Sequence, residues 1–99
     1  IKNNVHAQAF YGVLSAVFDE AKEAEVSPDF VAEIAKEITK IVANHSQVDW
    51  TNNKTIHDRI SQDIDDLFYG YEKERGLKLS FDTIDKIIEN VKTVALRRF

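Results

Sequence analysis

The chain has 99 residues, of which 43% are hydrophobic and 30% charged, and its formal net charge is −4 at pH 7. That apolar fraction is too high for a disordered tail, and the acidic balance disfavours a protein that coats nucleic acid. The chain has no cysteine and no apolar run of roughly 18 residues, and no signal peptide is visible in it. We therefore expect neither a disulfide framework nor a membrane span, and a cytoplasmic location.

Turn-forming residues are scarce, because the chain contains only 3 Gly and 1 Pro. A β-sandwich of this length would need several turns rich in these residues. We therefore predict an all-α fold, a bundle of about four amphipathic helices joined by short connections. Residues 1–99 are expected to form a single helical domain. Because the chain begins at Ile1 and contains no Met, this domain is expected to be a fragment of a larger protein.

The first predicted helix covers residues 5–24. Its segment from Ala9 to Phe18 is apolar almost all round, which indicates burial on two sides or contact with a partner. Three aromatic residues of this helix are therefore candidate interface residues: Phe10, Tyr11 and Phe18. Gly12 costs a helix about 1 kcal/mol relative to Ala, so its presence predicts a close backbone approach there.

Three further helices have recognisable ends. Ser27 is expected to cap the second, with Pro28 in its first turn, and Thr51 to cap the third, which ends at Gly76. Ser80 is expected to cap the fourth. Each helix carries an apolar stripe at helical spacing. The stripes are Val31, Ile34, Ile38, Ile41 and Val42; Ile56, Ile60, Ile64, Leu67 and Tyr71; and Phe81, Ile84, Ile87, Ile88, Val91 and Ala95.

No set of residues predicts a catalytic or metal site. The three histidines lie in different predicted elements, and without cysteine a zinc site would need carboxylates beside them. They are His6, His45 and His57. Four aspartates of the third helix are read as a solvated face, because Ile64 and Leu67 between them belong to the apolar stripe. They are Asp58, Asp63, Asp65 and Asp66.

Two features of the sequence bear on phosphate binding, its glycines and its basic last helix. The glycines stand singly at 12, 70 and 76, so no phosphate-binding loop is predicted. The last helix is basic, with Lys92, Arg97 and Arg98, and could contact a phosphate backbone. A helical nucleic-acid-binding module that uses this helix is therefore the alternative function.

Trp50 is the only tryptophan and lies in the connection between the second and third helices. In a structural interpretation it closes the end of the bundle, while Asp49 and Thr51 cap the third helix. In a functional interpretation it anchors an interface. The two roles can coexist.

The motif Val48-Asp49-Trp50-Thr51 resembles a pattern near the C-terminus of R subunits of type I restriction enzymes. There a helix is followed by a hydrophobic residue, Asp-Trp-Thr and an amphipathic helix. Residues 30–38 are similar to the preceding helix and residues 9–12 to the one before it. The helix after the motif is basic in many members of this family but acidic here, which argues against a DNA-facing role.

The resemblance implies the C-terminal helical domain of a subunit that is an ATP-dependent, site-specific endonuclease. Its nuclease and motor domains, with ATP and Mg²⁺, would lie elsewhere in that subunit. Within these 99 residues no cofactor, metal or catalytic residue is expected, so the fragment itself is not expected to be an enzyme. The resemblance further implies docking of the motor onto the methyltransferase and specificity subunits. The domain would also contact the rest of the R subunit, and would meet DNA only through the complex.

Overall fold

Apolar residues that recur every three or four positions produce four α-helices in the computed structural model, which describes residues 4–46 and 49–99. The helices are α1 (Val5–Ala21), α2 (Pro28–His45), α3 (Lys54–Arg75) and α4 (Phe81–Arg98), and Trp50–Asn52 form a 3₁₀ turn, η1. No strand occurs in these two segments, which confirms the all-α prediction.

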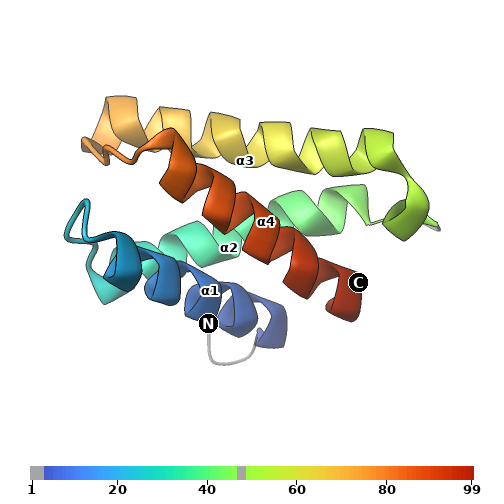
Figure 1. The fold of residues 1–99 in the computed structure, drawn as a ribbon. Helices are drawn as coiled ribbons and strands as arrows, with labels where there is room; N and C mark the ends of the chain where they lie inside the picture. Colours follow the sequence, from blue (N-terminus) through green and yellow to red (C-terminus); the bar gives the residue numbers. More distant parts are fainter. Residues whose placement is uncertain (1–3, 47–48) are drawn as a thin grey trace.

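Successive helices run in opposite directions, so their connections alternate between the two ends of the bundle (Figure 1). α1 packs against both α2 and α4, and α3 packs against α2 and α4. We call the end with residues 22–27 and 76–80 the loop end, and the end with η1 the Trp50 end. At the loop end, the Ser80 backbone N–H donates a hydrogen bond of 3.0 Å to the Glu23 carboxylate, which ties the two connections together.

The core lies where the apolar stripes of the four helices meet. Its most completely buried large side chains are Phe10, Leu14, Ile34, Ile38, Val42, Ile60, Ile64, Ile87 and Val91. Other stripe residues pack against this core while partly exposed: Ile41, Ile56, Leu67 and Ile84. Full burial of one such side chain contributes roughly 1.5–3 kcal/mol. The helices are therefore held by packing between stripes, in the way the sequence periodicity predicted.

Most predicted helix ends are confirmed. The Ser27 hydroxyl accepts a hydrogen bond from the Phe30 N–H, and the Ser80 hydroxyl accepts one from the Thr83 N–H, each of 3.2 Å. Gly76 ends α3 in the left-handed conformation, with φ of 71°. Glycine adopts that conformation without the steric cost that a Cβ atom would add.

The predicted cap of the third helix was wrong. Thr51 lies inside η1, and Asn53 instead caps α3, its side-chain oxygen accepting bonds from the N–H groups of Thr55 and Ile56. The Asp49 side chain makes no capping bond either. The reason is that the chain first makes one 3₁₀ turn after Asp49, which delays the start of α3.

Three smaller expectations also fail. α1 ends at Ala21 rather than residue 24, because Lys22 turns left-handed and donates to the Phe18 carbonyl at 3.0 Å. Gly12 is exposed, and a Cβ atom there would have no neighbour within 4 Å, so no close backbone approach occurs. Phe81 is 88% exposed. It is the first residue of α4, where side chains lean toward the helix N-terminus and extend past the core.

Candidate interaction surface

In the part of the Trp50 segment that the structure describes, only Trp50 is buried. Val48 lies outside the described residues. Asp49 has a left-handed backbone with φ of 64°, Thr51 is exposed, and the Trp50 side chain is only 2% exposed. A buried tryptophan contributes through its packing on this chain, so its burial supports the structural interpretation over an exposed anchor.

Two histidines hold the Trp50 end together. The His57 ring lies 5.4 Å from the Trp50 ring between centroids, and its Nε2 atom is 3.0 Å from the Trp50 carbonyl oxygen. His45 at the end of α2 contacts Asp63 of α3, with 2.7 Å between Nε2 and Oδ2. These contacts link η1, α2 and α3, and they give His45 and His57 partners within the protein.

The candidate interface residues of α1 lie mainly in the core. Phe10 is 0% exposed and Phe18 8%, while Tyr11 is partly buried. The Phe10 ring stacks with the ring of Phe99, with centroids 6.4 Å apart. α1 is apolar on two sides because it packs between α2 and α4, so the pattern does not require an outside partner.

The ion pairs among the described residues are single pairs on the surface. Within residues 4–46 and 49–99, no group of three or more histidine or carboxylate side chains is placed to hold a metal ion. At the basic end of α4, Lys92 pairs with Glu89 at 3.1 Å, while Arg97 and Arg98 border a depression of about 430 Å³ with Ala9 and Val94. No described helix is long and apolar enough to cross a bilayer.

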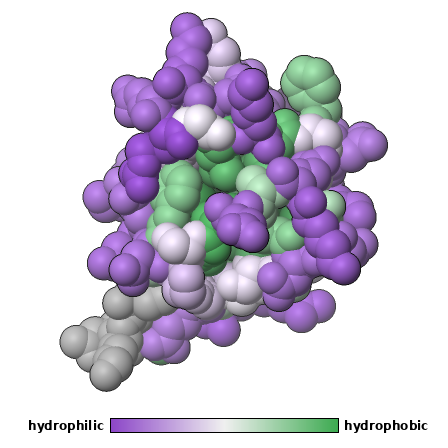
Figure 2. Space-filling view, turned by 90° about the vertical axis from the view of Figure 1, so that its left-hand side faces the viewer, coloured by the Kyte–Doolittle hydropathy of each residue, from purple (hydrophilic) through white to green (hydrophobic). Residues whose placement is uncertain are grey.

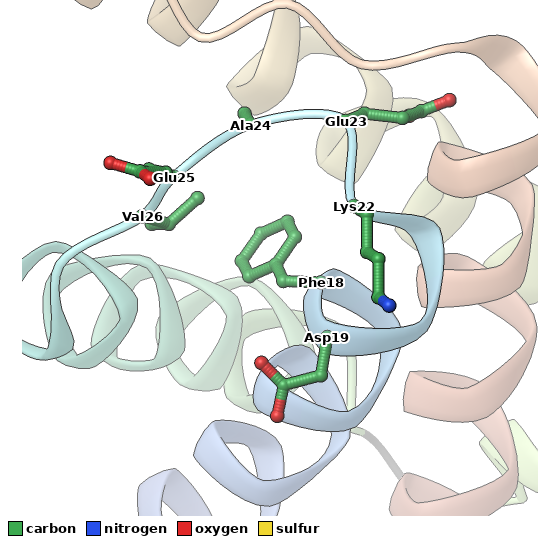
Figure 3. Close-up of a pocket in the computed structure, with 7 residues that line it drawn as sticks. All are labelled: Phe18, Asp19, Lys22, Glu23, Ala24, Glu25 and Val26. Atoms are coloured by element: carbon green, nitrogen blue, oxygen red, sulfur yellow. The ribbon is translucent and has the colours of Figure 1, made fainter.

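The loop end has a different surface. Viewed from that end, apolar side chains gather near the middle of the visible face, with polar side chains around them (Figure 2). One hollow, of about 640 Å³, lies under the α1–α2 loop. Figure 3 shows Phe18 and Val26 pointing into the space under this loop, while Glu25 points away. The remaining lining residues are Asp19, Lys22, Glu23 and Ala24.

A second hollow, the α3–α4 groove, has a volume of about 550 Å³. Its apolar lining is Phe68, Tyr69, Leu77, Leu79, Phe81 and Ile84, and its carboxylates are Asp65, Asp66, Glu72 and Asp85. Ser80 completes the lining. Two of its aromatic residues are largely exposed, Tyr69 at 58% and Phe81 at 88%. Exposed aromatic side chains beside an apolar hollow are typical of interaction surfaces.

Sequence reasoning missed this surface, although one signal was present. Tyr69 falls outside the stripe of α3 and stands beside the aspartates of the solvated face. A large aromatic residue on such a face has no place in the core, so it marks a position worth examining for binding. Phe81 gave no such signal, because its spacing fits the stripe of α4.

Comparisons with known proteins agree with the resemblance noted in the sequence. A family model described as "Type I restriction enzyme HindI endonuclease subunit-like, C-terminal" matches residues 4–95. Searches of curated proteins and of solved structures give no match. The matched segment includes all of α1, α2, η1 and α3 and most of α4. The chain therefore belongs to the family of C-terminal domains of type I restriction enzyme endonuclease (R) subunits of the HindI-like kind.

Proposed function

We propose that this domain is an assembly module, which attaches the ATP-dependent motor and nuclease subunit to the methyltransferase–specificity core. The domain would act as a single folded unit and would hold none of the subunit's catalytic residues itself. Its partners are the rest of the R subunit and the core subunits, and DNA is reached only through the complex.

The observation that carries this proposal is the exposed aromatic pair beside the α3–α4 groove. Tyr69 and Phe81 are large side chains left in solvent, although the same chain buries Phe10 and Trp50 almost completely. Water contact of such rings is unfavourable by roughly 25 cal/mol per Å² of apolar surface, which a partner protein would remove. Family membership supplies the context, a subunit that works within a larger enzyme.

Deletion of the domain from the full R subunit tests the proposal. We expect the deleted subunit to lose stable association with the methyltransferase–specificity core, measured by native mass spectrometry or size-exclusion chromatography with light scattering. The 99-residue chain added in excess should compete with the intact subunit, and a Trp50→Ala chain that has lost its fold should not. A deleted subunit that still binds the core with unchanged affinity would refute the proposal.

The alternative, direct nucleic-acid binding through α4, gives a different result. Each phosphate neutralised by a lysine or arginine steepens the loss of affinity with salt. Binding of the chain to duplex DNA, weakened by Arg97→Ala and steeply dependent on salt, would favour that alternative. The formal net charge of −4 is the reason we place it second.

A further inference from the structure

The α3–α4 groove has an apolar floor and an exposed aromatic border. Phe68 and Leu77 are 2% and 6% exposed, so they form a fixed floor that belongs to the core. Leu79 and Ile84 are partly buried and form the sides. Tyr69 comes from α3 and Phe81 from the first turn of α4, so the two exposed rings belong to different elements. A side chain entering the groove would therefore contact both helices and the connection between them.

The charges of the groove are of one sign. Its four carboxylates belong to Asp65, Asp66, Glu72 and Asp85. In the described segments none of them forms an ion pair, whereas Glu20, Glu33 and Glu89 elsewhere on the surface each pair with a lysine or arginine. Asp66 accepts a hydrogen bond of 2.9 Å from the neutral side chain of Gln62. The four carboxylates that line the groove are therefore not neutralised by an ion pair within the described residues.

These carboxylates also act on one another. Partial burial raises the pKa of Asp65, and the negative charges of Asp85 and Asp66 raise it further. Like charges held this close repel, and a cation brought between them would relieve that repulsion. Nearby, the Lys73 ammonium lies 4.9 Å from the centre of the Tyr69 ring, which shows that this ring can face a cation.

We propose that the α3–α4 groove binds a basic amphipathic helix of a partner protein. Aliphatic side chains of that helix would enter between Tyr69 and Phe81, and its lysine or arginine side chains would pair with the acidic border. This mode is that of an amphipathic helix laid in an apolar groove, with charge complementarity selecting the partner. The inference deepens the proposed assembly function and rests on it for the identity of the partner as a subunit of the complex.

A second copy of the chain is a poorer occupant of the groove. Each copy carries a net charge of −4, so association would bring like charges together. The basic end of α4 lies at the Trp50 end, far along the bundle from the groove (Figure 1). A contact between that end and the groove of the next copy would be head-to-tail, and such contacts produce rings or open filaments rather than a simple dimer.

Peptide binding to the 99-residue chain tests the chemistry of the groove. The probe is a helical peptide with a leucine stripe and lysines elsewhere, compared with a peptide that has glutamates in place of the lysines and with a scrambled lysine peptide. We expect the amphipathic lysine peptide to bind about tenfold more tightly than both, by fluorescence anisotropy. Its NMR chemical-shift changes should centre on residues 65–85.

Two groove variants and one control variant locate the binding. Tyr69→Ser combined with Phe81→Ser should weaken the lysine peptide about tenfold, because both rings are exposed hot-spot candidates. Val5→Ser combined with Leu96→Ser, which removes exposed side chains outside the groove, should leave binding unchanged. Replacing Asp65, Asp66 and Asp85 by Asn should weaken binding and flatten its salt dependence. Far-UV circular dichroism should be unchanged in every variant.

Equal binding of the lysine and glutamate peptides, equal effects of the groove and control variants, or self-association of the chain through the groove would each overturn the inference. The Tyr69→Ser, Phe81→Ser variant of the full R subunit then distinguishes a failure of the groove inference from a failure of the proposed assembly function. If deletion of the domain abolishes assembly but this variant assembles normally, the groove inference fails and the assembly function stands. If the peptide results hold but deletion leaves assembly intact, the assembly function fails instead.

Discussion

The two ends of the bundle differ in how far their aromatic side chains are buried. At the Trp50 end, a tryptophan is almost fully buried and is contacted by His57, while the rings of His6 and Phe99 lie 4.4 Å apart between centroids. At the loop end, Phe81 is 88% exposed and two hollows remain open. One end therefore buries its tryptophan, and the other leaves the rings of Tyr69 and Phe81 largely exposed to solvent.

Residue type alone does not separate these roles. Trp50 and Phe81 both stand at the start of a helical element, directly after a connection. What differs is whether other elements cover the ring: the Trp50 turn folds back onto α3, whereas Phe81 begins α4 beyond the last layer of the core. In this bundle, the connection that ends in the 3₁₀ turn has its aromatic ring covered, and the connection that runs directly into α4 has its aromatic ring exposed.

The largest difference between the ends should appear when each aromatic ring is removed. Trp50→Ala should lower the free energy of unfolding by about 3–5 kcal/mol, because it leaves a large cavity in a closed site. That is a large share of the roughly 5–15 kcal/mol typical of a domain. Phe81→Ala should change it by less than about 0.5 kcal/mol, since exposed side chains contribute little. Urea denaturation followed by circular dichroism measures both.

If Trp50→Ala kept full stability but lost assembly with the methyltransferase core, Trp50 would be an interface anchor and the contrast between the ends would be wrong. Conversely, a strongly destabilised Phe81→Ala chain would show that the loop end is also closed in solution.

Removing the cap of α3, also at the Trp50 end, should lower the free energy of unfolding by a smaller amount. Asn53→Ala should cost about 0.5–2 kcal/mol, because it removes the acceptor for the first N–H groups of α3. Thr51→Ala, two positions earlier and exposed, should cost less than about 0.5 kcal/mol. Thermal unfolding by calorimetry distinguishes them, and a larger cost at Thr51 would restore the cap predicted from the sequence.

Two glycines can be compared by the same substitution: Gly76, which ends α3 at the loop end, and Gly12, which lies inside α1. Gly76→Ala should destabilise by about 1 kcal/mol, because φ of 71° places the new Cβ atom against the backbone. Gly12→Ala should stabilise by up to about 1 kcal/mol, since that glycine lies in a helix interior with open space around it. Equal destabilisation at both positions would show that α1 needs close approach at Gly12 after all.

The smallest predicted effect depends on pH. Hydrogen bonds from Ser80 hold the pKa of Glu23 below its ordinary value. A carboxyl whose pKa is lower in the folded state stabilises the fold above its unfolded pKa, and that stabilisation is lost as pH falls through the folded pKa. Glu23→Gln should therefore be less stable than the original chain near neutral pH and equal to it in strong acid.

Glu25→Gln is the matched control, because Glu25 belongs to the same loop and forms no hydrogen bond or ion pair within the described residues. Denaturation midpoints measured across the acidic range for the three chains give the comparison. A Glu23→Gln chain whose difference persists in strong acid would mean that the charge of Glu23 is not what ties the two connections.

Structural features that depend on a few neighbouring residues could be predicted from the sequence. The stripe of α2, the Ser27 and Ser80 caps and the glycine end of α3 are local patterns, and all were predicted. Asn53 was missed because Thr51 and Asn53 are both acceptable caps, and only the folded chain shows that a 3₁₀ turn comes first. The groove was missed for a different reason. It depends on where α4 starts relative to α3, which no local pattern records.

The contact between the rings of His6 and Phe99 also shows where the first helix of the bundle begins and its last helix ends. It brings the first turn of α1 and the last residue of α4 to one edge of the Trp50 end. A polypeptide joined to either side of this domain would enter or leave at that edge, as is common for domains within longer chains. A junction at that edge would leave the loop end, with its two hollows, at the opposite end of the bundle from the point of attachment (Figure 1).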